Sequence, residues 1–242
     1  MYGWRARVGI IVSPPNTVAE VEYSRMAPQG VSVHASRMIR PSHMSKMGVR
    51  LNEATNEALP QVAATLAPLK PDVVVFAHTT ASMAMGAGRD AEFARMLSEP
   101  AGCPAITTIG AALTAFQALN VNRVALVTPY TSELAAIEKD YLEGSLPGLK
   151  VVKETSLGIS NGWEIGNLEP RTAYRAARDA DSGEADAIFI SGTNWRTIEV
   201  ISLLEQDLHK PIISGNQAGM WAALRELGIK GVNGFGVLFE RH

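Results

Sequence analysis

Two apolar stretches of the sequence, 72–77 and 186–190, each end in small polar residues that could carry chemistry. The residues that follow them are His78, Thr79 and Thr80 in the first case, and Ser191, Gly192, Thr193 and Asn194 in the second. An imidazole that titrates near neutral pH can move a proton. Hydroxyls, amides and backbone N–H groups can hold an anion without a competing counter-charge. Such residues at the ends of two buried strands indicate one small-molecule cleft built from two related halves.

Three further turns of the sequence carry polar residues. Asn16 follows the apolar stretch 7–12, Tyr130 and Thr131 follow the stretch 123–127, and Asn161 lies in the loop 158–166. Asparagine at such positions is also typical of helix caps and turns, so a purely structural role for Asn16 and Asn161 stays open.

Apolar runs bounded by Gly, Pro and hydroxyl residues predict strands, and apolar residues at helical spacing predict helices between them. The expected strands are 7–12, 31–38, 72–77, 103–108, 123–127, 149–155, 186–190 and 211–214. The expected helices are 18–26, 52–69, 91–97, 110–119, 134–142, 170–180, 197–208 and 217–227. Strands that alternate with helices predict an α/β fold with parallel sheets.

Equal spacings between strand-end residues indicate an internal duplication. Asn16 and Tyr130 are 114 residues apart, and so are His78 and Gly192. We therefore expect two Rossmann-like lobes related by pseudo-twofold symmetry, with the active-site cleft between them. The first lobe is predicted to comprise residues 1–115 and 218–242, and the second lobe residues 116–217.

Composition narrows the function classes. The 22 Lys and Arg and 24 Asp and Glu residues give a formal net charge of −2, which argues against a nucleic-acid or membrane-surface partner. No apolar run is long enough to span a bilayer, and the start of the sequence lacks a signal-peptide pattern, so we expect a soluble cytoplasmic protein. The single cysteine, Cys103, excludes an internal disulfide and a cysteine-based zinc cage, and the histidines lack metal-ligand spacing.

Four ordered motifs resemble the maleate cis-trans isomerase and arylmalonate decarboxylase branch of the Asp/Glu racemase superfamily. The motifs are Val8–Thr17, Val124–Thr131, Ser160–Gly166 and Ser191–Asn194. The resemblance implies a small carboxylate bound between two lobes, no metal or organic cofactor, and a homo-oligomer such as a dimer. It also implies that Asn16, Tyr130 and Asn161 hold the carboxylate. The resemblance further implies that a carboxylate or oxyanion is surrounded by Thr79, Thr80, Thr131, Thr193 and Asn194.

The sequence departs from this branch at the catalytic positions. Racemases and maleate isomerases of the group carry a cysteine in each lobe, and the decarboxylases keep only the second. Here the matching positions are His78 and Gly192, and Cys103 falls in neither motif. Two-base racemisation, thiolate addition and protonation by a cysteine therefore each lose a required group.

The sequence thus predicts a cofactor-independent isomerase or lyase of a small mono- or dicarboxylate, with hydrolysis also possible. In this hypothesis His78 moves a proton or orients water. The alternative for His78 is a hydrogen-bonded wall residue, and the alternative for Gly192 is a tight turn rather than room for a water or a substrate group. A non-catalytic carboxylate-binding or sensor protein derived from this fold is the competing function.

Overall fold

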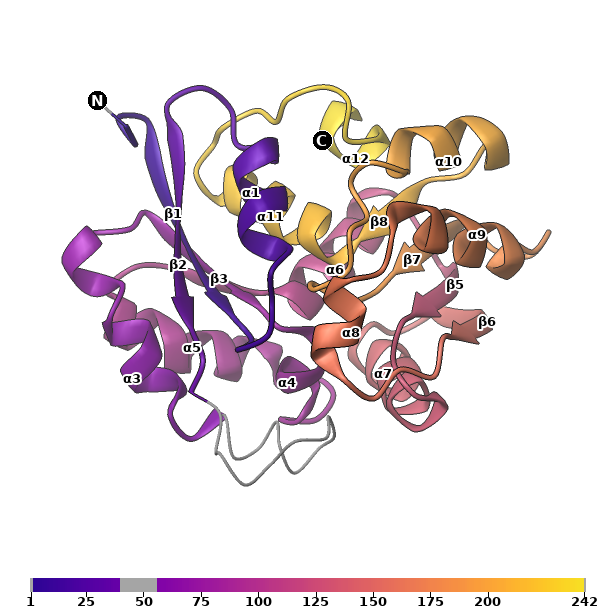
Figure 1. The fold of residues 1–242 in the computed structure, drawn as a ribbon, viewed down its shortest axis with the longest axis horizontal. Helices are drawn as coiled ribbons and strands as arrows, with labels where there is room; N and C mark the ends of the chain where they lie inside the picture. The colour runs from indigo at the N-terminus through magenta and orange to yellow at the C-terminus, as the bar shows by residue number, and fades with distance from the viewer. Residues whose placement is uncertain (1, 40–55, 242) are drawn as a thin grey trace.

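The computed structural model describes residues 2–39 and 56–241, which form two four-stranded sheets flanked by helices (Figure 1). The first sheet contains β1 (Ala6–Val12), β2 (Val31–Arg37), β3 (Val73–Ala77) and β4 (Ala105–Thr107). The second contains β5 (Arg123–Thr128), β6 (Lys150–Ser156), β7 (Ala187–Ile190) and β8 (Ile212–Ser214). Every strand pairing is parallel, so the predicted α/β fold with parallel sheets is confirmed.

The two sheets share one topology. Their strand orders are β2-β1-β3-β4 and β6-β5-β7-β8, as expected for duplicated lobes. The sequence separation of paired residues differs, however, because Val12 pairs with Ala77 in the first sheet (77 − 12 = 65) whereas Val127 pairs with Ile190 in the second (190 − 127 = 63). The spacing between paired strands is thus two residues longer in the first lobe. The equal spacing of the two strand-end pairs therefore does not extend to every position of the paired strands.

Helices cover both sheets and fill the space between them. They are α1 (Ala19–Met26), α3 (Leu59–Ala64), α4 (Thr79–Met83), α5 (Asp90–Ala101), α6 (Thr108–Ala118), α7 (Ser132–Ser145), α8 (Gly162–Gly166), α9 (Pro170–Ala180), α10 (Ile201–Leu208), α11 (Gly215–Glu226) and α12 (Val237–Arg241), with a 3₁₀ turn η1 (Ala67–Leu69). Each of these helices is too short or too polar to cross a membrane.

The burial of the strands explains their composition. All residues of β3 and β7, the third strands of their lobes, are buried, whereas the edge strand β2 is only partly buried. A parallel strand with helices on both faces has no solvent side, so it reads as a continuous apolar run rather than an alternating one. The run ends where the strand leaves the sheet, and the polar residues that follow must find hydrogen bonds there.

Helix α11 connects the lobes. It follows β8 of the second sheet but packs against β3, α6 and α1 of the first lobe (Figure 1). Its start is fixed by a capping box, in which the Ser214 side chain accepts from the Gln217 N–H and the Gln217 side chain accepts from the Ser214 N–H. Glu22 of α1 accepts hydrogen bonds from the N–H groups of Thr197 and Ile198 and from Asn216 Nδ2. A buried carboxylate thus ties the lobes behind the strand ends.

Several predicted segments differ in the structure. The helix expected over 197–208 begins only at Ile201. The residues after Ala77 were expected to form a loop, but Thr79–Met83 is the short helix α4, because His78 accepts a hydrogen bond from the Ala81 N–H and caps it. The expected helix 52–69 is shorter, with α3 beginning at Leu59 and Pro60 in its first turn; the part before residue 56 lies outside the described residues.

Candidate functional site at the facing strand ends

The carboxyl ends of β3 and β7 meet directly. Thr193 Oγ1 donates to the carbonyl oxygen of Ala77 at 2.8 Å, and Asn16 Nδ2 donates to Thr193 Oγ1 at 3.2 Å. Asn16 and Thr193 are buried, at 1% and 4% exposure. The structure therefore brings together the strand-end residues of the two lobes, as the sequence predicts.

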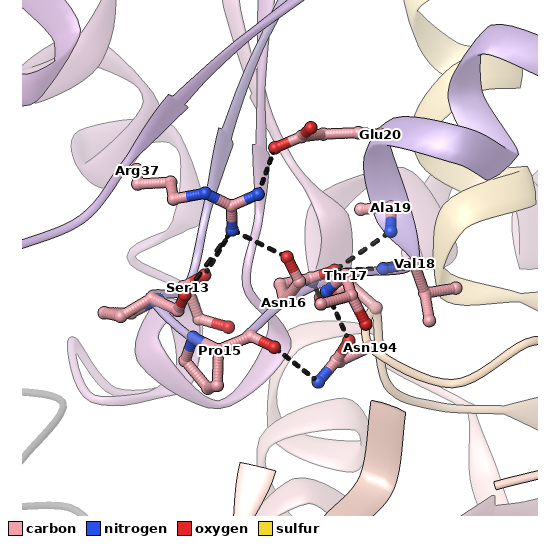
Figure 2. A network of polar contacts seen from close by, with 11 residues as sticks. Ser13, Pro15, Asn16, Thr17, Val18, Ala19, Glu20, Arg37 and Asn194 are labelled. Atoms are coloured by element: carbon pink, nitrogen blue, oxygen red, sulfur yellow. Dashed lines mark hydrogen bonds and ion pairs between the residues drawn. The ribbon is translucent and has the colours of Figure 1, made fainter. Parts of the chain in front are cut away.

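Asn16 is fixed by its own helix and by an arginine clamp (Figure 2). Its Oδ1 accepts from the N–H groups of Val18 and Ala19 at 3.0 and 2.9 Å. Arg37 of β2 donates to the carbonyl oxygen of Asn16 at 2.6 Å and pairs with Glu20. One hydrogen of the Asn16 amide points to Thr193, so its second hydrogen is the one that can serve an anion.

Asn194 braces the lobes rather than presenting a spare donor. Its Oδ1 accepts from the Thr17 N–H at 2.9 Å, and its Nδ2 donates to the carbonyl oxygen of Pro15 at 3.3 Å (Figure 2). The same Nδ2 also donates to the carbonyl oxygen of Gly162 at 2.6 Å. Both amide hydrogens are therefore used. The arrangement makes Asn194 a positioning residue for the Asn16 turn and for α8.

His78 is held as a neutral imidazole. Its Nδ1 lies 3.4 Å from both the Ala81 nitrogen and Thr80 Oγ1, and its ring lies 5.8 Å from the Phe76 ring. Because Nδ1 accepts the Ala81 N–H, the ring hydrogen sits on Nε2. Burial lowers the pKa of His78 to about 4. The expectation that His78 titrates near neutrality is therefore wrong, since a desolvated imidazole resists taking up a proton.

Gly192 lies in a conformation that favours glycine. Its φ is +104°, and a Cβ at this position would lie 3.3 Å from Pro129 Cγ and 3.4 Å from the Tyr130 hydroxyl oxygen. The tight turn, one of the two predicted roles, is thus what the backbone shows. The Tyr130 hydroxyl lies beside the space that a side chain at position 192 would enter.

Tyr130 is buried among other polar groups. The hydroxyls of Thr79 and Ser191 lie close enough to influence its ionisation, as does the carboxyl of Glu138, and burial raises its pKa above the usual value. The Thr128–Tyr130 turn also accepts hydrogen bonds from the N–H groups of residues 157–159, which fixes the start of the loop that leads to Asn161. The side chain of Tyr130 therefore lies beside Thr79 of the first lobe, and its backbone carbonyl holds the second-lobe loop that leads to Asn161.

Two further predicted residues lie at the edge of this cluster. Asn161 is exposed and caps α8, because its Oδ1 accepts from the Trp163 N–H at 3.0 Å. Thr131 is half-buried and precedes α7 without a side-chain capping hydrogen bond. The buried centre of the site is thus formed by Asn16, Thr79, Tyr130 and Thr193.

Sequence reasoning missed a buried acid behind the site. Glu138 of α7 is fully buried, and burial raises its pKa to about 8, although the neighbouring Ser191 hydroxyl partly lowers it. The signal was available, because Glu138 shares helical spacing with the buried Leu134, Ala135, Tyr141 and Leu142. A charged residue within an apolar helical stripe predicts a buried carboxyl.

Cys103 lies at the end of the first sheet that is opposite to the candidate site. It precedes β4, at the amino end of the first sheet, whereas the site lies at the carboxyl ends of the strands. Burial raises the pKa of its thiol to about 11, so the thiolate is disfavoured. Among the described residues, no group of three His, Cys, Asp or Glu side chains could hold a metal ion.

Comparisons with known proteins match this architecture. The sequence model of the arylmalonate decarboxylase family matches residues 8–239. The chain is 29% identical to the maleate isomerase of Nocardia farcinica over 231 residues, which is 91% of this chain and 90% of that protein. It is 30% identical to the arylmalonate decarboxylase of Bordetella bronchiseptica over 179 residues, or 69% of this chain and 71% of that protein.

A solved structure extends the match to the fold. A cysteine-to-serine mutant of the Nocardia farcinica maleate cis-trans isomerase, with a covalently bound succinylcysteine intermediate, has a TM-score of 0.90 and 25% identity, covering 98% of this chain and 99% of that chain. Two facing parallel lobes of this kind define an enzyme of the Asp/Glu racemase superfamily. Within it, the chain belongs to the arylmalonate decarboxylase family, whose matched relatives are isomerases and a decarboxylase.

Proposed function

We propose that the chain is a cofactor-independent enzyme that acts on a small mono- or dicarboxylate by decarboxylation, isomerisation or related proton-transfer or hydrolytic chemistry. The observation that carries the proposal is the direct contact of the two strand ends, in which Thr193 joins Ala77 to Asn16. That contact gathers neutral donors from both lobes. The relatives named maleate isomerase and arylmalonate decarboxylase support the substrate class.

The substrate carboxylate is assigned to neutral donors. Asn16 offers its second amide hydrogen, and Tyr130 offers its hydroxyl from the facing lobe; Asn161 completes the set from the exposed α8 turn. Several preorganised neutral donors stabilise a carboxylate without an arginine or lysine that would hold it equally tightly before and after reaction.

Charge that develops during the reaction is assigned to the first-lobe strand end. Loss of carbon dioxide or of a proton beside a carboxylate places negative charge on oxygen in an enediolate. His78 Nε2–H, with the hydroxyls of Thr79 and Thr80 and the N–H of Thr193, can stabilise that charge. A neutral imidazole suits this role because it donates a hydrogen bond and stays unprotonated above its lowered pKa.

A reaction through an enediolate is favoured over thiolate addition to a double bond. Addition needs a nucleophilic thiolate beside the substrate. Cys103 is the only cysteine of the sequence, lies at the opposite end of the strands, and has a raised pKa. Decarboxylation and α-proton transfer need only donors and a proton source, which the facing strand ends supply.

A second candidate is a non-catalytic carboxylate-binding or sensor protein. The bare Gly192 turn favours it, because that position contributes no side chain to chemistry. In this case the same donors would bind the carboxylate and no bond would change.

The test is a thermal-shift screen with malonate, phenylmalonate, maleate and succinate, followed by product analysis of each compound that stabilises the protein. We expect stabilisation and turnover, with turnover falling at least about 10²-fold in His78→Ala, which removes the Nε2–H donor. An exposed histidine, changed in His209→Ala, is the matched control and should retain wild-type turnover. Stabilisation without turnover supports the sensor, and unchanged turnover in His78→Ala removes His78 from the mechanism.

The assembly and location belong to the proposal as well. We propose a homo-oligomer, in the first instance a dimer, because the resemblance to the family implies one, and a cytoplasmic location from the sequence pattern. Light scattering of the purified chain would decide the first point, and fractionation of cells that express it the second.

A further inference from the structure

A buried carboxyl of the first lobe is surrounded by donors from the second lobe and from the start of α11. Glu22 of α1 is 2% exposed. Its Oε1 accepts from the N–H groups of Thr197 and Ile198 at 2.6 and 3.2 Å. Its Oε2 accepts from Asn216 Nδ2 at 2.7 Å, and from the Thr197 hydroxyl at the longer distance of 3.5 Å. Each of these partners is a donor, so the group that they surround acts as an acceptor.

The donors around Glu22 are neutral. Burial raises the pKa of Glu22 to about 7, although the hydrogen bonds from Asn216, Thr197 and Ile198 lower it in part. The charged group that acts on it, Glu199, has the same sign and is itself paired with Arg25 at 2.7 Å. Hydrogen bonds to an ionised carboxylate are stronger than those between neutral groups. Glu22 therefore holds its partners most firmly when the pH is above this pKa.

One nitrogen atom connects this carboxylate to the candidate site. Asn216 is 0% exposed, and its Nδ2 donates to Glu22 and also to the carbonyl oxygen of Thr193, at 3.0 Å. The Oδ1 atom of Asn216 has no hydrogen-bond partner among the described residues. The orientation of the Asn216 amide is therefore set by the two acceptors beside its nitrogen.

Thr193 is held from two sides. Its carbonyl oxygen accepts from Asn216, while its hydroxyl donates to the Ala77 carbonyl at 2.8 Å and accepts from Asn16 at 3.2 Å. A continuous series of hydrogen bonds thus runs from Glu22 through Asn216 and Thr193 to the first-lobe strand end.

We propose that Glu22 is a positioning residue of the candidate site, which acts through Asn216 to fix the backbone of Thr193 beside the first-lobe strand end. The inference rests on the proposed function, in which the N–H of Thr193 stabilises charge that develops during the reaction. An interaction made only with developing charge lowers the barrier without tightening the binding of the substrate. Loss of the correct position of Thr193 should therefore appear in kcat rather than in KM.

Replacing the acid by its amide tests this role with little change of shape. In Glu22→Gln, the new side-chain oxygen can still accept from the N–H groups of Thr197 and Ile198, but the new NH₂ group then faces the NH₂ group of Asn216. If the Asn216 amide turns over to relieve this contact, its oxygen faces the carbonyl oxygen of Thr193 instead. Either arrangement sets two like groups against each other beside Asn216, so Thr193 is displaced.

The test measures kcat and KM with phenylmalonate and maleate at pH 8, above the pKa of Glu22, for wild type, Glu22→Gln, Asn216→Ala and the double variant. We expect kcat to fall at least about tenfold in each single variant, with KM within about twofold of wild type. The double variant should lose no more than Asn216→Ala, because both changes act through one contact. Losses that multiply would overturn this contact as the route. Asn216→Ala keeps the bonds from Thr197 and Ile198 to Glu22, so it tests the same link if Glu22→Gln does not fold.

A matched control lies on α10. Glu205 Oε1 also accepts from two backbone N–H groups, those of Ile212 and Val237, at 3.1 and 3.2 Å. Glu205→Gln should therefore keep wild-type kcat. If wild type turns over and Glu22→Gln and Asn216→Ala retain its kcat, or if Glu205→Gln loses as much, the positioning role is overturned and the proposed function stands. If wild type turns over no probe, both are overturned.

Amide hydrogen exchange reports on the same link without turnover. Peptides that cover residues 191–198 should exchange faster in Glu22→Gln than in wild type, because their hydrogen-bonded anchor is weakened, and at the wild-type rate in Glu205→Gln. Unchanged exchange in Glu22→Gln overturns the positioning role, whatever the enzyme assay gives.

Discussion

The two facing strand ends share a topology and differ in almost every chemical respect. After β3 the chain turns at once into α4, and the neutral imidazole of His78 caps that helix. After β7 it forms a bare turn at Gly192, and the Tyr130 hydroxyl, from the turn after β5, lies 3.4 Å from where a Cβ of residue 192 would be. The comparison shows that the two lobes keep the same strand topology, whereas the polar side chains beside the corresponding strand ends come from different elements. A side chain from a neighbouring loop can occupy the place that the strand end leaves empty.

The largest expected change in the free energy of unfolding comes from removing Asn194, which joins the two facing strand ends. Asn194→Ala removes three hydrogen bonds that join the second-lobe end to Thr17, Pro15 and Gly162. At about 1 kcal/mol for each bond, the free energy of unfolding should fall by about 3 kcal/mol. Asn167→Ala, which removes one exposed amide bond to Trp163, is the control and should cost under about 1 kcal/mol. Equal losses in chemical denaturation would show that Asn194 does not brace the lobes.

Lowering the pH should reduce the free energy of unfolding through His78, which lies at the first-lobe strand end. The pKa of His78 is about 4 in the folded protein against 6.5 for an ordinary histidine, so the unfolded chain takes up a proton first as pH falls. Stability from this group is complete above pH 6.5 and is lost between pH 6.5 and about 4, by roughly 3 kcal/mol. Comparing denaturation of wild type and His78→Gln across this range isolates the contribution, because the buried acids are common to both. Parallel curves would contradict a neutral, half-buried imidazole.

The second-lobe end should respond to a single methyl group. Gly192→Ala forces a side chain into a backbone with φ of +104° and places its Cβ 3.3–3.4 Å from Pro129 and Tyr130. We expect a loss of about 1–3 kcal/mol in unfolding free energy and a fall in turnover, because the Tyr130 hydroxyl is displaced. Gly183 has open space around its Cβ position and no positive φ, so Gly183→Ala is the matched control. If the two variants denature alike, the turn at Gly192 is not constrained.

The smallest effect is expected at the rim of the first lobe. Arg37→Met removes the donor to the Asn16 carbonyl and a half-exposed ion pair with Glu20. The free energy of unfolding should fall by about 1 kcal/mol, since exposed ion pairs contribute little, while KM rises because the Asn16 turn loosens. Arg89→Met, which breaks a comparable exposed pair with Glu92, should leave KM unchanged. A KM that rises equally in both would refute the clamp.

Much of the fold was predictable because buried parallel strands leave a plain sequence signal. The stretch 73–77 reads as one apolar run, and β3 is buried at every position. The helical start at Thr79 was not predictable from propensity, because the cap is a histidine ring rather than a serine or aspartate. The sequence separation between paired strands differs between the lobes, because it depends on the length of the segments that connect them, and equal spacing of two residue pairs could not reveal that difference.

The polar residues that meet at the site could be predicted from the sequence, whereas the contacts that hold them in place could not. Asn16, Thr193 and Tyr130 lie together because strand ends converge at one edge of each sheet. The role of Asn194 as a brace follows from partners more than thirty residues away in the sequence. The pKa of His78 depends on desolvation by the folded protein, which residue type alone does not encode.

The most direct measurement is an NMR analysis of the products formed from phenylmalonate and maleate by the purified wild-type protein in D₂O. From phenylmalonate the account predicts phenylacetate that carries one deuterium at the carbon that was protonated, with the yield lost in Tyr130→Phe and lowered in His78→Gln. Recovery of unchanged phenylmalonate and maleate, without deuterium and in the presence of demonstrated binding, would contradict catalysis at the facing strand ends.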